Sequence, residues 1–464
     1  MHLRILPLLA LTTLTLSISA QVNSPYSRYG LGNMYPGSFT AANGMGGLSA
    51  ANFSPSAINF LNPASFAEIG GASFDVGVYG TVMSLNTNSE TFTSGDANLS
   101  NMAFAFPVYK NLRRDRFGLS FGLVPFSTFQ YDILDETDTG DPDLGTKQYN
   151  YVGDGQLYQL YGGFGYRHQT DTVSQVKSIQ GRQDTVISAG FLSIGASSAL
   201  LFGSLYNTTY ASFPDILNSQ TTKLSRDNDV NGGMYNIGVG YQKQYVRKHG
   251  TKRDILNWKF GGTFSPQVDV HGTQSILWTN ILKYGNYETV TDTLYTAPDT
   301  SGNIHMPMSY SAGLSFSFFS SDDENKNQFT LGLQYASTMW SQYDGFQDAG
   351  ELADSWRATL GAEFIPKKKQ DQNAPLMYRF GAYTGKSNLI IDGVQLNDVG
   401  FSAGLAIPMG YGENVLPYYR NSKINMFLNV GQRGANADIS ETYFNFGVGF
   451  SMIDLGWFMK YKLN

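Results

Sequence analysis

Apolar side chains alternate with small or polar ones along much of this chain, and this period of two constrains the fold more than any other feature. From Phe117 to Leu123 every second residue is Phe or Leu, and the residues between them are Gly or Ser. Segments 310–318 and 444–450 repeat the pattern. Because successive side chains of a β-strand point to opposite faces, the pattern predicts strands with one apolar face and one small or polar face.

A soluble β-sandwich would show the same period, so other features must separate it from a membrane barrel. The alternating segments are longer than usual strands, and their apolar face is rich in aromatic residues. The chain has 51 Gly, 29 Tyr and 31 Phe, and only 15% of its residues are charged. Glycine and serine on the second face fit a crowded or wet lumen. We therefore predict an all-β fold, a transmembrane antiparallel β-barrel.

Turn signals between the alternating runs divide this barrel into about fourteen strands. Short connections are expected on the periplasmic side and long loops outside, notably 132–146, 205–230 and 273–307, so both termini should be periplasmic. Segment 273–307 could hide an extra hairpin, and the tail 454–464 could extend the last strand or dock below it. The expected strands are 72–84, 99–110, 115–131, 147–168, 186–204, 231–246, 255–272, 308–319, 327–342, 354–366, 376–387, 397–409, 421–432 and 440–453.

Residues 1–20 have the order of a secretory signal peptide, with a short basic start, a leucine-rich stretch and small residues at the end. We expect cleavage between Ala20 and Gln21. A membrane-anchoring helix is the alternative, but the apolar stretch is shorter than the ~20 residues that a spanning helix needs. With no cysteine in the chain, lipid attachment and disulfides are excluded. The outer membrane of a Gram-negative bacterium is the expected location.

Several functional classes are disfavoured by composition and spacing. The formal net charge of −6 argues against binding to nucleic acid. The five histidines show no metal-ligand spacing, and no nucleophile elbow is present, so we predict neither an enzyme nor a metal or cofactor. The acidic stretch 132–143 lacks the spacing of an EF-hand and is expected to be a solvated outer loop.

Residues 21–70 do not alternate and contain several glycines and prolines, so they are not expected to be a wall strand. Their apolar content disfavours a disordered tail. We predict that they form a plug in the lumen and that residues 71–464 form the barrel.

Two stretches resemble a known family. The run NGMGGLSAANFSPSAINFLNPASF (43–66), with its Asn62-Pro63-Ala64 triplet just before the first strand, resembles the hatch of FadL-type long-chain fatty acid transporters. The expected third strand GLSFGLVPFSTFQYD, with Pro125 and Phe126, is similar to the third strand of that family. The stretches SPYSRYGLG (24–32) and WFMKYKLN (457–464) resemble members from Bacteroidetes-type bacteria, and this departure leaves the substrate open.

The resemblance implies transport of hydrophobic small molecules, which enter a cavity beside the hatch and leave laterally through a gap in the wall. It makes Pro125 and Phe126 candidates for the lateral gate, because proline removes a ladder donor. A proline tolerated at a bulge is the alternative for Pro125. Asn-Pro is also a common turn opener, so Asn62, Pro63 and Ala64 have a purely local explanation as well.

Three arginines are candidates to hold a fatty carboxylate, because a guanidinium offers paired donors. They are Arg357 and Arg379 on the small or polar face of neighbouring strands, and Arg28 in the hatch. The alternative is an Arg–Glu network with Glu363 that braces the lumen.

Two functions remain open on the sequence. One is a transporter whose partners are a hydrophobic ligand or lipid and the lipid of the outer membrane. The other is a non-transporting FadL-like barrel that serves as a structural component of a secretion or assembly complex, with protein partners bound through loops 205–230 and 273–307.

Overall fold

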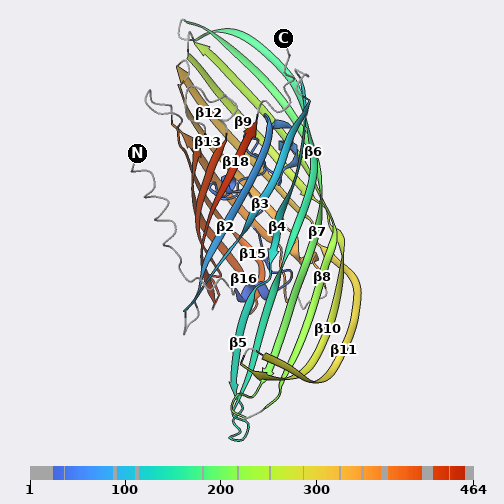
Figure 1. Ribbon diagram of the computed structural model, residues 1–464. Coiled ribbons are helices and arrows are strands. Elements are labelled where there is room, and N and C mark those ends of the chain that lie inside the picture. The colour runs from blue at the N-terminus through green and yellow to red at the C-terminus, as the bar shows by residue number, and fades with distance from the viewer. Residues whose placement is uncertain are drawn as a thin grey trace, which may run out of the picture.

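Fourteen antiparallel strands form a closed barrel in the computed structural model (Figure 1). The first and last wall strands close it, since Ala72 pairs with Asp454 and Asn86 with Ser440. The rim at Ala72 and Asp454 is called here the basal rim, and the opposite one the extended rim. The wall strands are β2 (Ala72–Asn86), β3 (Thr91–Tyr109), β4 (Asp115–Thr128), β6 (Thr146–Ile179), β7 (Arg182–Ser212), β8 (Thr221–His249), β9 (Lys252–Ser265), β12 (Ser309–Asp322), β13 (Asn325–Thr338), β14 (Ser355–Ile365), β15 (Met377–Ile391), β16 (Val394–Pro408), β17 (Lys423–Arg433) and β18 (Ser440–Asp454).

The structure describes most of the chain after residue 23, and the predicted signal peptide and the tail 455–464 lie outside the described residues. No helix in the described part is long and apolar enough to cross a membrane. The described residues are 24–35, 37–86, 91–109, 114–179, 182–216, 219–249, 252–285, 287–322, 325–345, 350–366, 375–409, 422–437 and 439–454.

The alternation of the sequence has the predicted consequence in the wall. Large apolar side chains such as Leu119, Phe316 and Phe446 are exposed on the outside of the barrel. Their neighbours Ser120, Ser315 and Ser317 are buried on the opposite face. The predicted fold class, an antiparallel barrel of about fourteen strands, is confirmed.

One side of the barrel rises beyond the extended rim as a six-stranded sheet, called here the extension (Figure 1). It consists of β5 (Tyr131–Asp138), the ends of β6, β7 and β8, and the hairpin β10 (Val268–Tyr284) and β11 (Tyr287–Met306). The hydrogen-bonded order is β5-β6-β7-β8-β10-β11.

The extension corrects the predicted loops. Segments 132–146, 205–230 and 273–307 are mostly strand, and the extra hairpin that 273–307 could hide is present. The prediction missed these strands because both faces of a sheet beyond the membrane can be polar, so the apolar alternation that marks a wall strand is lost.

The N-terminal segment lies inside the barrel. It carries four short elements: η1 (Pro25–Arg28), β1 (Asn33–Met34), α2 (Thr40–Asn43) and η2 (Pro63–Glu68). Residues 24–35, called here the strap, lie near the extended rim, because Ser24 contacts Glu441 at the start of β18. Residues 37–71, called here the inner segment, lead to the start of β2 at the basal rim.

Candidate functional site

Glycines on the lumen face of the wall give the inner segment its seat. A Cβ on Gly118 would lie 1.9 Å from the Phe66 carbonyl oxygen, and one on Gly261 would lie 1.8 Å from the Ala50 carbonyl oxygen. Such distances are impossible for real atoms, so only glycine admits the backbone here. These glycines form a belt across neighbouring strands that includes Gly118, Gly165, Gly195, Gly238, Gly261, Gly332, Gly361, Gly381 and Gly404.

The register of the wall places glycines of the belt directly opposite one another on neighbouring strands. Gly165 pairs with Gly118 on one side and with Gly195 on the other. Gly361 pairs with Gly332 and with Gly381 in the same way. The glycine-rich face predicted for a crowded lumen therefore has a specific cause, which is close contact with the backbone of the inner segment.

Asn62 holds the inner segment to itself and to the wall. Its side chain is fully buried and donates to the Ala50 carbonyl at 2.7 Å and to the Val239 carbonyl at 3.4 Å. Its Oδ1 accepts from the Ala64 N–H at 3.1 Å and so caps η2, in which Pro63 occupies the first turn. The Asn62-Pro63-Ala64 triplet thus acts as a helix start and as a buried link between two turns of the segment.

The wall has a break between β3 and β4, in the half near the extended rim. The ladder between these strands runs from Tyr109 and Phe117 to Met102 and Leu123 and stops there. In the described residues, Thr91–Asn101 of β3 pairs with β2 but not with β4. Beyond Leu123, β4 continues to pair with β6 on its other side, so the break lies on one edge of β4 alone.

The strap fills this break. Asn33 pairs with Thr128 and Met34 with Ser127, so β1 forms a short ladder with β4. Tyr35 then bridges the two wall strands: its N–H donates to the Phe126 carbonyl at 2.9 Å, and its hydroxyl lies 2.6 Å from the Ser100 hydroxyl of β3.

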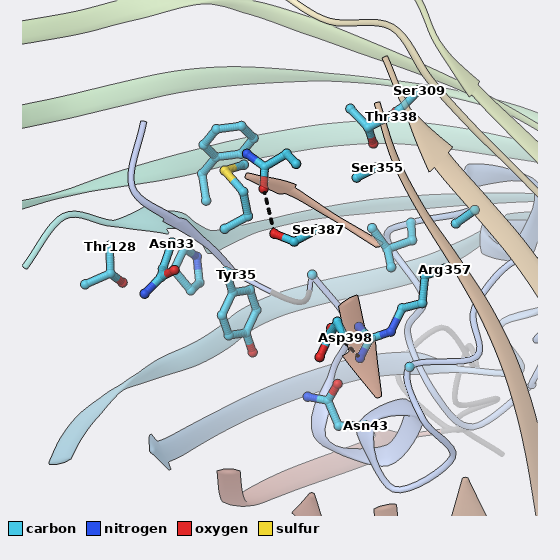
Figure 2. Close-up of a pocket in the computed structure, with 18 of the residues that line it drawn as sticks. Asn33, Tyr35, Asn43, Thr128, Ser309, Thr338, Ser355, Arg357, Ser387 and Asp398 are labelled. Carbon is cyan, nitrogen blue, oxygen red and sulfur yellow. Dashed lines mark hydrogen bonds and ion pairs between the residues drawn. The ribbon is translucent and has the colours of Figure 1, made fainter. Parts of the chain in front are cut away.

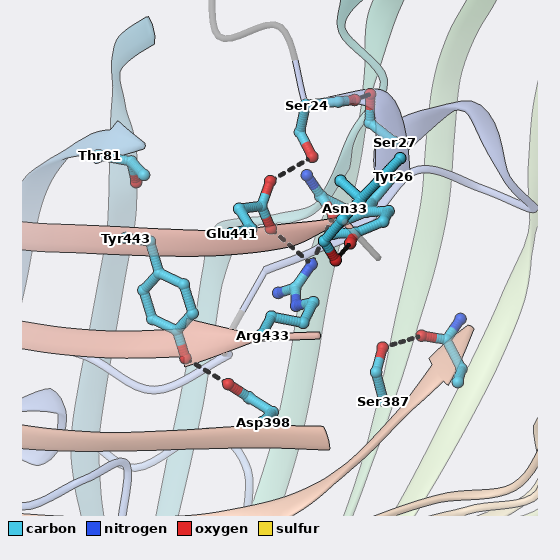
Figure 3. Close-up of polar contacts among 12 residues, drawn as sticks. Ser24, Tyr26, Ser27, Asn33, Thr81, Ser387, Asp398, Arg433, Glu441 and Tyr443 are labelled. Atoms are coloured by element: carbon cyan, nitrogen blue, oxygen red, sulfur yellow. Dashed lines mark hydrogen bonds and ion pairs between the residues drawn. The ribbon is translucent and has the colours of Figure 1, made fainter. Parts of the chain in front are cut away.

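A buried polar cluster holds the start of the strap to β17 and β18 (Figure 3). Ser24 donates to the Glu441 carboxylate at 2.7 Å, and Arg433 lies 3.6 Å from the other carboxylate oxygen. Arg433 also donates to Asn33 at 3.1 Å, and the Tyr26 hydroxyl donates to the Ile439 carbonyl at 2.7 Å. The Glu441 side chain is fully buried, so a negative charge on it would be costly without these partners.

A cavity of about 560 Å³ lies between the strap, the inner segment and the wall (Figure 2). Its volume falls within the range of ligand-binding pockets. Near the break in the wall it is lined by Met34, Tyr35, Pro125 and Phe126, and elsewhere by hydroxyl, amide and charged groups. Those shown in Figure 2 include Asn43, Thr128, Ser309, Thr338, Ser355, Arg357, Ser387 and Asp398.

The structure brings some of the predicted site residues to this cavity. Pro125 and Phe126 line it, just past the last pair of β4 with β3 and at a bulge in the ladder with β6. Arg357 also lines it: its guanidinium lies 3.5 Å from the centre of the Tyr383 ring and 4.0 Å from the Asp398 carboxylate. The Arg357 Nε is buried and has no hydrogen-bond partner in the described part of the chain.

The other two predicted arginines have different surroundings. Arg379 is 5% exposed and donates to Glu363 at 2.8 Å and to Asn425 at 2.9 Å, which is the bracing network considered as the alternative. Arg28 is exposed and stacks over the Tyr151 ring at 4.3 Å. Within the described residues, no group of three His, Asp or Glu side chains is placed to hold a metal ion.

Sequence reasoning missed Tyr35, Glu441 and Arg433. A signal for the last two was present: both are charged residues that flank the connection between the last two strands. A charge on a strand of this barrel is expected to face the lumen, because lipid-facing charges are costly. Tyr35 had no comparable signal, because its role depends on the end of a ladder elsewhere in the chain.

Comparisons with known proteins give matches of low sequence identity to solved membrane transporters. The toluene transporter TbuX of Ralstonia pickettii is 15% identical, with 90% of this chain and 99% of that chain covered at a TM-score of 0.45. The Pseudomonas putida toluene transporter TodX is 15% identical, with 89% of this chain and 98% of that chain covered at a TM-score of 0.42. A Pseudomonas aeruginosa FadL homologue is 12% identical, with 91% of this chain and 100% of that chain covered at a TM-score of 0.44.

A search of curated proteins gives no match. A protein-family model described as BamG matches residues 1–175 and 185–464, which is nearly the whole chain.

Proposed function

This chain belongs to the BamG family, and we propose that it transports hydrophobic, fatty acid-like small molecules through the outer membrane by way of a lateral exit in the barrel wall. In this proposal the extended rim faces outward and the basal rim faces the periplasm. Residues 1–20 are the export signal, and residues 21–70 form the plug.

The observation that carries this proposal is the break between β3 and β4, which the strap closes. A continuous wall offers an apolar solute no route into the membrane. Here the ladder ends at Met102 and Leu123, and the strap, not a wall strand, takes the free edge of β4. Backbone groups that face lipid without partners cost several kcal/mol, so a usable gap needs such a cover.

The cavity lies beside this break, which supports a path between them. Met34, Tyr35, Pro125 and Phe126 line the cavity where it adjoins β4. A solute that leaves here for the bilayer keeps its apolar surface out of water, which contributes about 25 cal/mol per Å². Arg357 lines the cavity and is a candidate to hold a carboxylate through its terminal guanidinium nitrogens while the apolar part points towards the break.

The test is to join the strap to β4 by a reversible bond. Met34 and Ser127 are register partners, and the chain has no cysteine of its own, so the pair Met34→Cys and Ser127→Cys forms a single defined disulfide. Uptake of a fluorescent long-chain fatty acid by whole cells should fall when the disulfide forms and recover on reduction. A matched control is Leu333→Cys with Leu360→Cys, register partners in the intact ladder of β13 and β14. Unchanged uptake with a fully formed strap disulfide would rule out this exit.

A second function is favoured by the extension, which a lateral exit between β3 and β4 does not require. A non-transporting barrel in a secretion or assembly complex would use it as a contact surface. Lipid mass spectrometry of the detergent-extracted protein separates the two functions. A defined hydrophobic molecule retained by the wild type and lost in Arg357→Ala supports transport, whereas its absence from both favours the interaction role.

A further inference from the structure

The outermost strand of the extension has a free edge. β11 pairs with β10 along its length, and its other edge has one isolated bridge, from His305 to Asp344, in the described part of the chain. Every residue from Tyr287 to Thr296 is exposed. An edge of this length offers a row of unpaired N–H and C=O groups, which is a template for another strand.

Large apolar side chains gather along the same hairpin, beyond the barrel wall. Tyr287 is 81% exposed, Tyr284 63%, Val290 58% and Tyr295 53%. Exposed aromatic residues that are close together are typical of surfaces that bind other proteins. The hairpin therefore combines a backbone template with side chains that gain from being covered.

The edge is protected against pairing with another acidic strand but not against pairing with a cationic one. Natural edge strands carry lysines, prolines or inward charges that discourage a partner. In β11 there is no Lys or Arg and a single proline, Pro298, while Glu288, Asp292 and Asp299 supply negative charge. Glu288 is engaged by Lys223 and Lys283, which leaves Asp292 and Asp299 as the acidic groups of the outer part.

The charge of the whole extension indicates what kind of strand would fit. Segments 131–154, 203–231 and 268–306 contain fourteen Asp and Glu and four Lys and Arg, a net −10, whereas the chain as a whole is −6. The rest of the chain is thus net positive. Two copies of β11 would repel each other, so pairing between copies is disfavoured, while a cationic strand is attracted.

We propose that the free edge of β11 is a docking site for an extended, lysine- or arginine-bearing segment of another protein, which adds to the extension as a further strand. Main-chain hydrogen bonds along the edge provide the affinity, and the acidic groups select the partner's charge. The site lies outside the barrel, so this proposal does not depend on transport.

The experiment uses the full-length protein in detergent micelles and a synthetic 12-residue peptide of alternating Lys and Val. The peptide should bind with an affinity that falls as salt rises. A copy N-methylated at alternate residues cannot complete the ladder and should bind at least about tenfold more weakly. A copy with Glu in place of Lys should not bind. A photoreactive group in the peptide should cross-link to β11.

Matched variants of the protein separate a strand site from a general attraction to negative charge. The double variant Asp292→Asn and Asp299→Asn should weaken binding about tenfold. The control Asp132→Asn and Asp135→Asn removes the same charge from β5 at the opposite edge and should change binding by less than about twofold. Equal binding of the N-methylated peptide, equal effects of the two double variants, or no binding of the basic peptide would each overturn the proposal.

Discussion

The two parts of the N-terminal segment are held in the barrel by different means. The inner segment is enclosed by a belt of wall glycines whose spacing leaves no room for a Cβ. The strap is held by a two-residue ladder, by Tyr35 and by the polar cluster around Glu441. A segment enclosed by close packing cannot leave its position in small steps. A segment held by a few hydrogen bonds can open one bond at a time, at a cost of about 1 kcal/mol each.

This difference assigns different roles to the two parts. Under the proposed function, the inner segment keeps the barrel closed, and the strap is the part that moves without disturbing that closure.

The largest effect should follow from filling the glycine belt. In Gly165→Val the new side chain would meet the Pro63 carbonyl and the Ala67 N–H, at 2.7 and 2.8 Å from the Cβ. Overpacking of this kind costs about 1–3 kcal/mol or more, so the inner segment should leave its seat. Limited proteolysis should then cut between Phe53 and Phe66, a stretch that should be protected in the wild type. Gly162→Val, three residues along the same strand with nothing within 4 Å, is the control. Equal protection in both variants would contradict the enclosure.

The next effect concerns the link inside the inner segment. Asn62→Ala removes one donor and one acceptor and leaves the Ala50 carbonyl and the Ala64 N–H buried without their partner. The expected loss is about 1–3 kcal/mol. Hydrogen exchange should accelerate from Ala50 to Ala64, with the strap unchanged. Asn62→Asp keeps the acceptor for Ala64 but turns a buried carboxylate oxygen towards the Ala50 and Val239 carbonyls, so its loss should be larger than that of Asn62→Ala. Wild-type exchange in Asn62→Ala would contradict the role of this side chain.

A smaller effect is expected at the strap, where the strap and not the inner segment should exchange faster. Ser24→Ala removes the hydrogen bond to the buried Glu441 carboxylate, which contributes about 1.5 kcal/mol for a charged acceptor. Exchange of the strap amides should rise about tenfold, while the inner segment keeps its wild-type protection. If both parts exchange faster together, the N-terminal segment is a single unit and the proposed division is wrong.

The smallest effect on stability should come from Pro125→Val. The residue lies at a bulge, where valine is sterically tolerated, so the change in gel mobility on heating that is expected of a folded barrel should match that of the wild type. The variant restores an N–H donor and favours a continuous strand, so uptake of the fluorescent fatty acid should fall. Pro107→Val is the control, because Pro107 also lies at a bulge but pairs with Gly118 within the intact ladder of β3 and β4, away from the break. Wild-type uptake in Pro125→Val would show that this proline does not shape the exit.

The sequence predicted the barrel well because lipid enforces alternation on every wall strand. Phe117, Leu119 and Phe121 face outward as their period indicated. The extension escaped prediction because water on both sides removes that constraint. Tyr287 and Val290 are apolar yet exposed, and no local rule distinguishes such residues from an irregular loop.

The site was predicted only where a local motif carried it. Asn62 and Pro125 were identified because Asn-Pro and a mid-strand proline have local meanings, although their roles in transport remain predictions. Glu441 and Tyr35 act through partners hundreds or tens of residues away, on strands whose register the sequence does not state. Arg379 and Arg357 have the same local pattern, and only the three-dimensional contacts show that one is fully paired and the other faces the cavity.

The contact between Ser24 and Glu441 also bears on how the protein is assembled, because 417 residues separate the two in the sequence. The start of the strap can bind only after the last hairpin has formed. The same hairpin closes the barrel by pairing with β2. Contacts so distant in sequence form late and slowly. The inner segment must therefore be in place before or as the seam closes, since the glycine belt that holds it is drawn from strands on all sides. We therefore expect the last hairpin to pair with β2 as the N-terminal segment takes its place in the lumen. A chain without this hairpin should neither close its barrel nor hold the start of its N-terminal segment.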